Sequence, residues 1–220
     1  MNSNFSFLLL GLLSLTFWQC KSGSERSGES TESLPYLGNW YVDSTIVDGK
    51  VAYDTVYHKI AEFSFINQMG DTISKSDVTG KVYVADFFFT TCPTICPIMK
   101  KEMLRVNEQY KENSDFVILS HSIDPTHDTQ EVLKDYAEKL GVPNAKTWNF
   151  LTGDQEKIFE IGQTSYLTTA MADQNEAGGF LHSGAFVLVD QTGRIRGVYD
   201  GTKSDQVDRL LQDIPKLLTK

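Results

Sequence analysis

The sequence contains few cysteines, and their number excludes one class of protein at the outset. The 220-residue chain has three, Cys20, Cys92 and Cys96, which are too few for a small scaffold held by several disulfides. Basic residues are also in the minority, because 20 Lys and Arg stand against 29 Asp and Glu and leave a formal net charge of −9. A nucleic-acid role is therefore not expected, since the chain offers no basic stripe to phosphates.

The amino-terminal region lacks charge, and its apolar run is short for a transmembrane helix. None of the first 20 residues is charged, and Phe5–Trp18 is almost wholly apolar. An apolar segment of this length is typical of the core of a signal peptide. It leads to Cys20, and residues 21–35 are rich in Ser, Gly and charge, which predicts a flexible tether.

This layout predicts an exported bacterial lipoprotein, anchored to the membrane in the periplasm or on the face of the cell envelope. Residues 1–20 form the signal segment, Cys20 carries the lipid, residues 21–35 form the tether and residues 36–220 form one folded domain. Acylation of Cys20 leaves Cys92 and Cys96 as the only pair of thiols, which removes the odd thiol of an exported chain. The amino end has no Lys or Arg, and bulky residues precede Cys20, so an uncleaved anchor stays open as the alternative.

The folded region predicts an α/β domain. Val82–Phe89 and Phe116–Ile123 are apolar runs expected of buried strands, and helical periodicity follows each of them. Asp128 and Glu131 can cap the second of these helices, and Gly141 can end it. Further strands are expected at Glu62–Ile66, Thr72–Ile73, Trp148–Leu151, Ala185–Asp190 and Ile195–Tyr199, and further helices at Asp154–Gly162 and Thr202–Leu218. This order predicts a thioredoxin-like fold with an N-terminal β-hairpin extension and an irregular insertion, Gln163–Leu181, that leads to His182.

Cys92 and Cys96 stand where a predicted buried strand becomes a helix. The first N–H groups of a helix are unsatisfied and favour negative charge, so a thiol placed there loses its proton more easily. Pro97 suits the first turn, where its missing N–H costs nothing. A purely structural disulfide is the simpler alternative, but closing so short a loop removes little entropy from the unfolded chain. The pair is therefore predicted to bind a metal or to be redox-active.

His182 is the histidine expected at this site. It stands immediately before a predicted core strand, and open α/β sheets bind ligands at the end where such connections meet. His58, His121 and His127 are expected to be surface or packing residues. Two thiolates and one imidazole form a soft set of three ligands that suits Cu(I) and also Zn(II), so the residue types alone leave the metal open.

Four short motifs, in this order along the chain, resemble the Sco/SenC family. They are Thr90-Thr91-Cys92-Pro93-Thr94-Ile95-Cys96-Pro97, Ser122-Ile123-Asp124-Pro125, His182-Ser183 and Asp190-Gln191-Thr192-Gly193, and the resemblance spans about Phe63 to Ile214. It implies a membrane-tethered, thioredoxin-like copper protein that assists assembly of the copper centre of cytochrome c oxidase. Such a metallochaperone is a carrier more than a turnover enzyme, and its partner is the copper-bearing subunit of the oxidase or another exported copper protein.

The resemblance also implies roles for individual residues. Cys92, Cys96 and His182 match the copper ligands of the family, and Asp124 matches a supporting acidic residue. The chain departs from the family pattern at Thr94 and Leu181, where Asp is frequent, and at His127, where Arg is common. These departures spare the three ligands but change the polarity around them, which tunes metal affinity and potential.

Asp86 supports a second function. It lies in the middle of an apolar strand, six residues before Cys92, where thioredoxins keep a buried acid. A buried carboxyl has a raised pKa and can act as acid or base, unless the residue lies at a strand edge facing solvent. The alternative function is therefore an extracytoplasmic thiol–disulfide oxidoreductase that acts on partner cysteines.

Two features of the sequence count against that alternative. Three residues separate the cysteines instead of two, and no Pro precedes the strand at Ala185. A thiol peroxidase is disfavoured as well, because Phe89 stands where those enzymes carry Thr.

Overall fold

The computed structural model describes residues 33–218. The predicted signal segment, Cys20 and residues 21–32 of the predicted tether lie outside this range. Among the described residues, no helix combines the length and the apolar character that crossing a membrane requires.

A seven-stranded mixed sheet forms the centre of the domain, with strand order β11-β10-β5-β6-β7-β3-β4. β5, β6 and β7 run parallel, whereas β10 pairs antiparallel with β5, and β3 pairs antiparallel with β7. The strands of this sheet are β3 (Ser64–Asn67), β4 (Thr72–Ser74), β5 (Val82–Phe88), β6 (Phe116–Ser122), β7 (Trp148–Thr152), β10 (Ala185–Val189) and β11 (Ile195–Asp200). Two separate hairpins pair β1 (Trp40–Val47) with β2 (Lys50–Tyr57), and β8 (Ala170–Ala172) with β9 (Phe180–His182).

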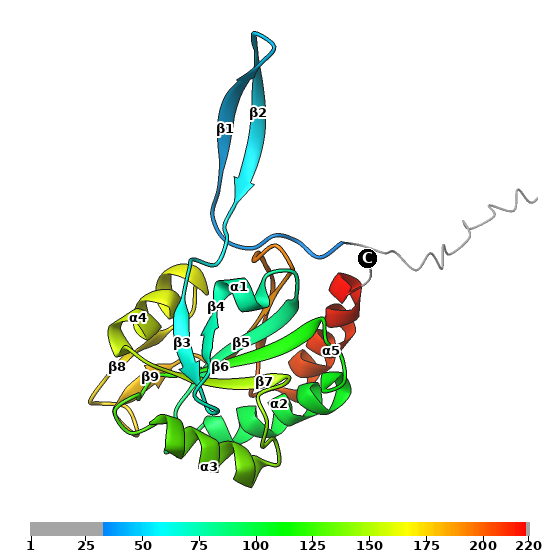
Figure 1. Ribbon diagram of the computed structural model, residues 1–220. Helices are drawn as coiled ribbons and strands as arrows, with labels where there is room; N and C mark the ends of the chain where they lie inside the picture. Colours follow the sequence, from blue (N-terminus) through cyan, green and yellow to red (C-terminus); the bar gives the residue numbers. More distant parts are fainter. Residues whose placement is uncertain (1–32, 219–220) are drawn as a thin grey trace, which may run out of the picture. The chain divides into compact units, whose positions relative to one another are not determined.

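Helices cover both faces of the sheet (Figure 1). They are α1 (Lys75–Val78), α2 (Cys96–Tyr110), α3 (Gln130–Leu140), α4 (Gln155–Glu160), the π-helical turn η1 (Ile161–Ser165) and α5 (Ser204–Leu218). Connections between parallel strands are right-handed, so α2 and α3 share a face, and α5 packs beside α2 on that face. α4 and η1 lie on the opposite face. Phe88 of β5 contacts Tyr136 of α3, and its neighbour Phe87 contacts Tyr166 after η1, each with ring centroids 5.7 Å apart. Because successive residues of β5 point to opposite covered faces, this strand is apolar except for Asp86.

The predicted fold class is confirmed, including the hairpin β3–β4 that precedes β5. Two predictions need correction. The insertion before His182 is not wholly irregular, because it contains the hairpin β8–β9. Asp128 does not cap α3; the N-cap is Thr129, whose hydroxyl accepts the N–H of Val132, while Asp128 is fully buried.

The hairpin β1–β2 has no counterpart among the predicted elements. Every residue of β1 is exposed, and only the last three residues of β2 are partly covered. Its base is fixed where Tyr57 and Tyr36 meet, with ring centroids 4.4 Å apart. The guanidinium of Arg196 lies over Tyr36, pairs with Asp190 at 3.0 Å and donates to the carbonyl of Pro35. The hairpin is thus attached to the domain at one end only.

Candidate metal centre

The two cysteines of the site lie at the junction of β5 and α2. After β5 the chain turns, and the N–H of Cys92 donates to the carbonyl of Phe89 at 3.2 Å. Cys96 is the first residue of α2 and Pro97 the second, so the proline occupies a position whose N–H needs no helical partner. Both thiols are free, and both side chains are buried.

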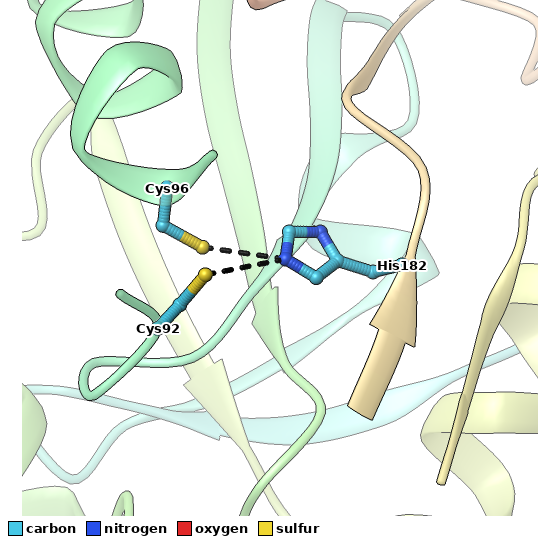
Figure 2. Close-up of side chains that lie close together, drawn as sticks. All are labelled: Cys92, Cys96 and His182. Atoms are coloured by element: carbon cyan, nitrogen blue, oxygen red, sulfur yellow. Dashed lines mark hydrogen bonds between the residues drawn. The ribbon is translucent and has the colours of Figure 1, made fainter. Parts of the chain in front are cut away.

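His182 reaches the cysteines because β10 pairs with β5. Val187 stands opposite Ala85 in this antiparallel pair. His182 lies five residues before Val187, and Thr90 lies five residues after Ala85. The register therefore brings His182 beside Thr90, at the start of the turn that carries Cys92. Its Nε2 atom lies 3.4 Å from Sγ of Cys96 and 3.8 Å from Sγ of Cys92 (Figure 2).

Aromatic packing holds His182 in this position. Its ring meets the ring of Phe89 edge-on, with centroids 5.8 Å apart, and Phe180 packs on Phe89 at 5.3 Å. Gly178 has a φ of 88° and lies so close to Phe89 that a Cβ atom there would come within 2.7 Å of the ring. The β8–β9 hairpin therefore fits tightly over Phe89, and a side chain at position 178 would push it away.

The two thiols differ in acidity. Burial alone would raise the pKa of Cys92, but hydrogen bonds from His182, the N–H of Cys96 and Thr94 outweigh it and lower the pKa from 9.0 to about 6. Burial raises the pKa of Cys96, and the neighbouring Cys92 sulfur raises it further. Cys92 lies before α2 and is acidic because of these hydrogen bonds, whereas Cys96 at the start of the helix is not acidic because desolvation dominates there.

Asp86 is buried on the α2 side of the sheet, with 5% of its surface exposed, so the solvent-facing strand edge considered above is wrong. It lines a small cavity together with Cys96 and Tyr136. Burial raises the pKa of Asp86 from 3.8 to about 7, although the hydroxyl of Ser120 donates to the carboxylate and offsets part of the shift. Trp148 in turn donates its indole N–H to Ser120 at 2.8 Å.

Asp128 is a site-supporting residue that the sequence analysis did not identify. Its carboxylate accepts the N–H of Thr90 at 3.0 Å, the hydroxyl of Thr90, and the hydroxyl of Ser122 at 2.5 Å. It thereby ties the start of the cysteine turn to the end of β6. The sequence offers one signal for this role, the position of Asp128 shortly after the Asp124-Pro125 segment, but a helix cap is the simpler explanation of an acid at that position.

The remaining predicted residues lie away from the three donors or make no side-chain contact with them. Asp124 contributes its backbone carbonyl, which accepts the N–H groups of His127 and Asp128. His121 is fully buried and stacks on Phe87 at 5.1 Å; burial lowers its pKa to about 3, so it stays neutral. Nε2 of His58 lies 2.7 Å from the carbonyl oxygen of Ser165, and the side chain of His127 is exposed.

The three donors fit a transition-metal ion. Their ligand atoms all lie within 4.8 Å of one another, and within residues 33–218 no other group of three or more His, Cys, Asp or Glu meets this criterion. An ion with bonds of about 2.3 Å to sulfur and about 2.0 Å to nitrogen separates these atoms by roughly 3.7 Å in trigonal geometry. The observed 3.4 and 3.8 Å bracket that value. Nδ1 of His182 is buried without a hydrogen-bond partner among the described residues, so the usual support for a ligating imidazole is missing here.

The sequence and the fold are similar to those of known proteins. A family model described as SCO1/SenC matches residues 52–219. A SCO1/SenC family lipoprotein from Bacillus anthracis is 32% identical, and the match covers 73% of this chain and 95% of that chain with a TM-score of 0.66. BsSco, a member of the Sco family of cytochrome c oxidase assembly proteins with a disulfide switch, is 32% identical over 74% and 94% of the two chains, with a TM-score of 0.65. Arabidopsis thaliana ScoI, solved with copper bound, is 26% identical over 71% and 98%, with a TM-score of 0.58.

The buried carboxyl of Asp86 predicts a pH-dependent difference in stability between the wild type and Asp86→Asn. The folded protein holds this proton with a pKa of about 7, against 3.8 for the ordinary carboxyl of an unfolded chain. Between these values the folded state binds more protons, so Asp86 lowers the free energy of unfolding as the pH rises. An asparagine does not ionise and can still accept the Ser120 hydrogen bond.

We therefore expect Asp86→Asn to gain about 2 to 3 kcal/mol relative to the wild type between pH 5 and pH 8. The measurement is urea unfolding of the reduced, metal-free proteins at both pH values. The lowered pKa of Cys92 is common to both proteins and cancels in the comparison. A difference that does not change with pH would contradict the raised pKa of Asp86.

Proposed function

The chain belongs to the SCO1/SenC family, and on this premise we propose that it is a copper-binding metallochaperone that assists assembly of the copper centre of cytochrome c oxidase. The convergence of Cys92, Cys96 and His182 in one buried group is the observation that carries the proposal. Two of the similar proteins support it: one was solved with copper bound, and the other belongs to a family of oxidase assembly proteins.

The ligand chemistry favours copper. Thiolate and imidazole donors suit Cu(I), and among divalent first-row metals the affinity for N and S donors is highest for Cu(II). Bound copper would supply the transferable metal, and the residues of the chain would hold it. Cys92 is ready as a thiolate at neutral pH because of its low pKa, whereas Cys96 must give up its proton when it ligates.

Asp86 is placed to receive that proton. Its carboxylate lines the same small cavity as Cys96, and its pKa of about 7 allows it to accept and release a proton near neutrality. In this proposal Asp86 acts on the charge balance of the site without ligating the metal.

We place the protein at a membrane, anchored by a lipid on Cys20 and exported to the periplasm or the cell-envelope face. The apolar Phe5–Trp18 segment followed by Cys20 supports this location, and the similar Bacillus anthracis protein is a lipoprotein. The partner that receives the metal is then the copper-bearing subunit of the oxidase or another exported copper protein. A carrier held at the membrane would meet such a partner at high local concentration.

A second candidate is thiol–disulfide exchange with partner cysteines. The observation that favours it is the unequal acidity of the two free thiols, with an acidic Cys92 and a protonated Cys96 beside a buried carboxyl. Such a pair can attack a disulfide through one sulfur and resolve the mixed disulfide through the other. The similar BsSco has a disulfide switch.

The first test concerns the metal. We expect the reduced protein to bind one copper ion, and Cys92→Ser or Cys96→Ser to abolish this binding because each removes a thiolate ligand. Copper content is measured after loading and gel filtration, with zinc loading in parallel. Equal copper content in the wild type and both variants would end this proposal.

The second test concerns location. We expect cell fractionation to find the wild type with membranes and Cys20→Ser largely released, because the substitution removes the acylated sulfur. If Cys20→Ser stays fully bound, the lipid anchor is wrong and an uncleaved apolar segment is the better explanation.

The third test separates the two candidate functions. His182→Ala should weaken copper affinity by roughly a hundredfold or more, because it removes the imidazole ligand, yet it leaves both sulfurs able to form a disulfide. Asp86→Asn should slow the reduction of a disulfide substrate and leave copper stoichiometry unchanged. Each variant is assayed for copper affinity against a competing chelator and for the exchange rate. Wild-type copper affinity in His182→Ala would move thiol exchange to first place.

A further inference from the structure

The two faces of the β1–β2 hairpin differ in character. In an antiparallel pair, residues opposite each other point to the same face, and the register pairs Trp40 with Tyr57 and Val47 with Lys50. One face, which we call the uncharged face, consists of Trp40, Val42, Ser44, Ile46, Val51, Tyr53, Thr55 and Tyr57. The other face carries three charged residues, Asp43, Lys50 and Asp54. The strands thus form an amphipathic ribbon.

The uncharged face has no partner in the described part of the chain beyond its base, where Tyr36 covers Tyr57. Ile46 is 78% exposed, Tyr53 is 75% exposed and Trp40 is 63% exposed. A two-stranded hairpin is marginally stable in water by itself, and large exposed apolar patches are typical of contact surfaces. On the opposite face Asp43 stands directly across from Asp54, a repulsive pair that hydration relieves.

The size of the uncharged face argues against a second protein chain as its occupant. Strands of eight residues extend about 27 Å, and two strands make a ribbon roughly 10 Å wide. The face is therefore narrow, and a stable protein interface buries about 800 Å² of accessible surface on each partner, so a second copy of the chain would have to cover all of it. A ribbon attached at one end only offers no flanking surface to extend such a contact.

A lipid surface needs no such area when the protein is already tethered to it. Thirteen residue steps separate Cys20 from Ser33, so a lipid on Cys20 would keep the start of the described domain within about 45 Å of the membrane. Such a tether makes a weak contact effective. Trp and Tyr are the side chains that prefer the interface between membrane and water.

We propose that the uncharged face of the β1–β2 hairpin lies flat on the membrane surface and fixes the orientation of the domain. The proposal rests on the proposed membrane location but not on copper binding. The hairpin cannot insert further, because the outer edges of β1 and β2 keep unpaired N–H and C=O groups that require water. With the uncharged face on the lipid, Asp43 and Asp54 point to water.

The test uses the unit Glu32–Lys220, which is compact by itself and contains the buried core from Ile60 to Leu217. This unit lacks Cys20 and the apolar segment, so its affinity for lipid reports on the folded domain. We expect it to float with zwitterionic phosphatidylcholine vesicles at high lipid concentration, which replaces the proximity that the tether would supply. The double variant Ile46→Ser/Tyr53→Ser should reduce the bound fraction about tenfold, because apolar area is lost from the contact.

The matched control is Tyr41→Ser/Val47→Ser, which removes an aromatic and an aliphatic side chain from the opposite face. Both are more than half exposed, so the cost to the hairpin is comparable. We expect this control to bind vesicles within twofold of the wild type. Copper stoichiometry, measured on the same preparations, should be equal in all three proteins, so a failure of the copper proposal is recognised separately.

Tryptophan fluorescence gives a readout that does not depend on these variants. The unit contains Trp40, which is exposed, and Trp148, which is buried. Brominated lipids should quench Trp40 in the wild type, and Trp40→Phe should lose the quenched signal. Absence of vesicle binding by the wild type, or equal loss in both double variants, would overturn the proposal. So would a concentration-dependent dimer that Ile46→Ser/Tyr53→Ser abolishes, because the face would then serve a second copy.

Discussion

The antiparallel pairing of β10 with β5 is the constraint on which the site depends. The cysteines follow β5 directly, but His182 arrives from a distant segment, and only the register opposite Ala85 brings it to them. A slip of one residue would turn each side chain of β10 to the other face of the sheet. The core prevents such a slip, because Val187 and Leu188 are fully buried on opposite faces. Packing far from the metal donors thus sets their separation.

Burial disfavours the charged forms of Cys92, Cys96 and Asp86, and hydrogen bonds offset this effect to different extents. Cys92 receives enough hydrogen bonds to be acidic, whereas Cys96 and Asp86 are left with raised pKa values. A nearby positive charge lowers the pKa of buried groups of this kind and favours their ionised form. A cation at the three donors would supply that charge, which is why the metal-free site can hold protons where the proposed copper would bind. Thiol exchange uses the same groups, because Cys92 attacks as a thiolate and Cys96 must lose its proton to resolve the mixed disulfide.

Much of the fold was predictable because its signals are local. The apolar runs of β5 and β6 predict buried strands, and Gly141 predicts the end of α3. The order of the predicted elements then indicated the α/β thioredoxin-like class. The high pKa of Cys96 was not predictable because it arises mainly from burial in the folded domain. The role of Asp128 was not predictable because its partner Thr90 is distant in sequence. The hairpin β1–β2 was missed for another reason. Its signal, Asp48-Gly49 between alternating apolar residues, is local and strong, but it was not recognised.

The hairpin and the site lie near opposite ends of β10, and this separation has a physical consequence. Within residues 33–218, β1 and β2 pair only with each other, and their attachment runs through Tyr36, Tyr57 and the side chains of Arg194 and Arg196. Through these side chains the hairpin meets the sheet at the corner of β10 and β11, where Arg196 is bound to Asp190, whereas His182 precedes the other end of β10. If the hairpin rests on a surface as proposed, the length of β10 lies between that contact and the three donors, and because a packed core transmits strain, this distance favours an undisturbed site.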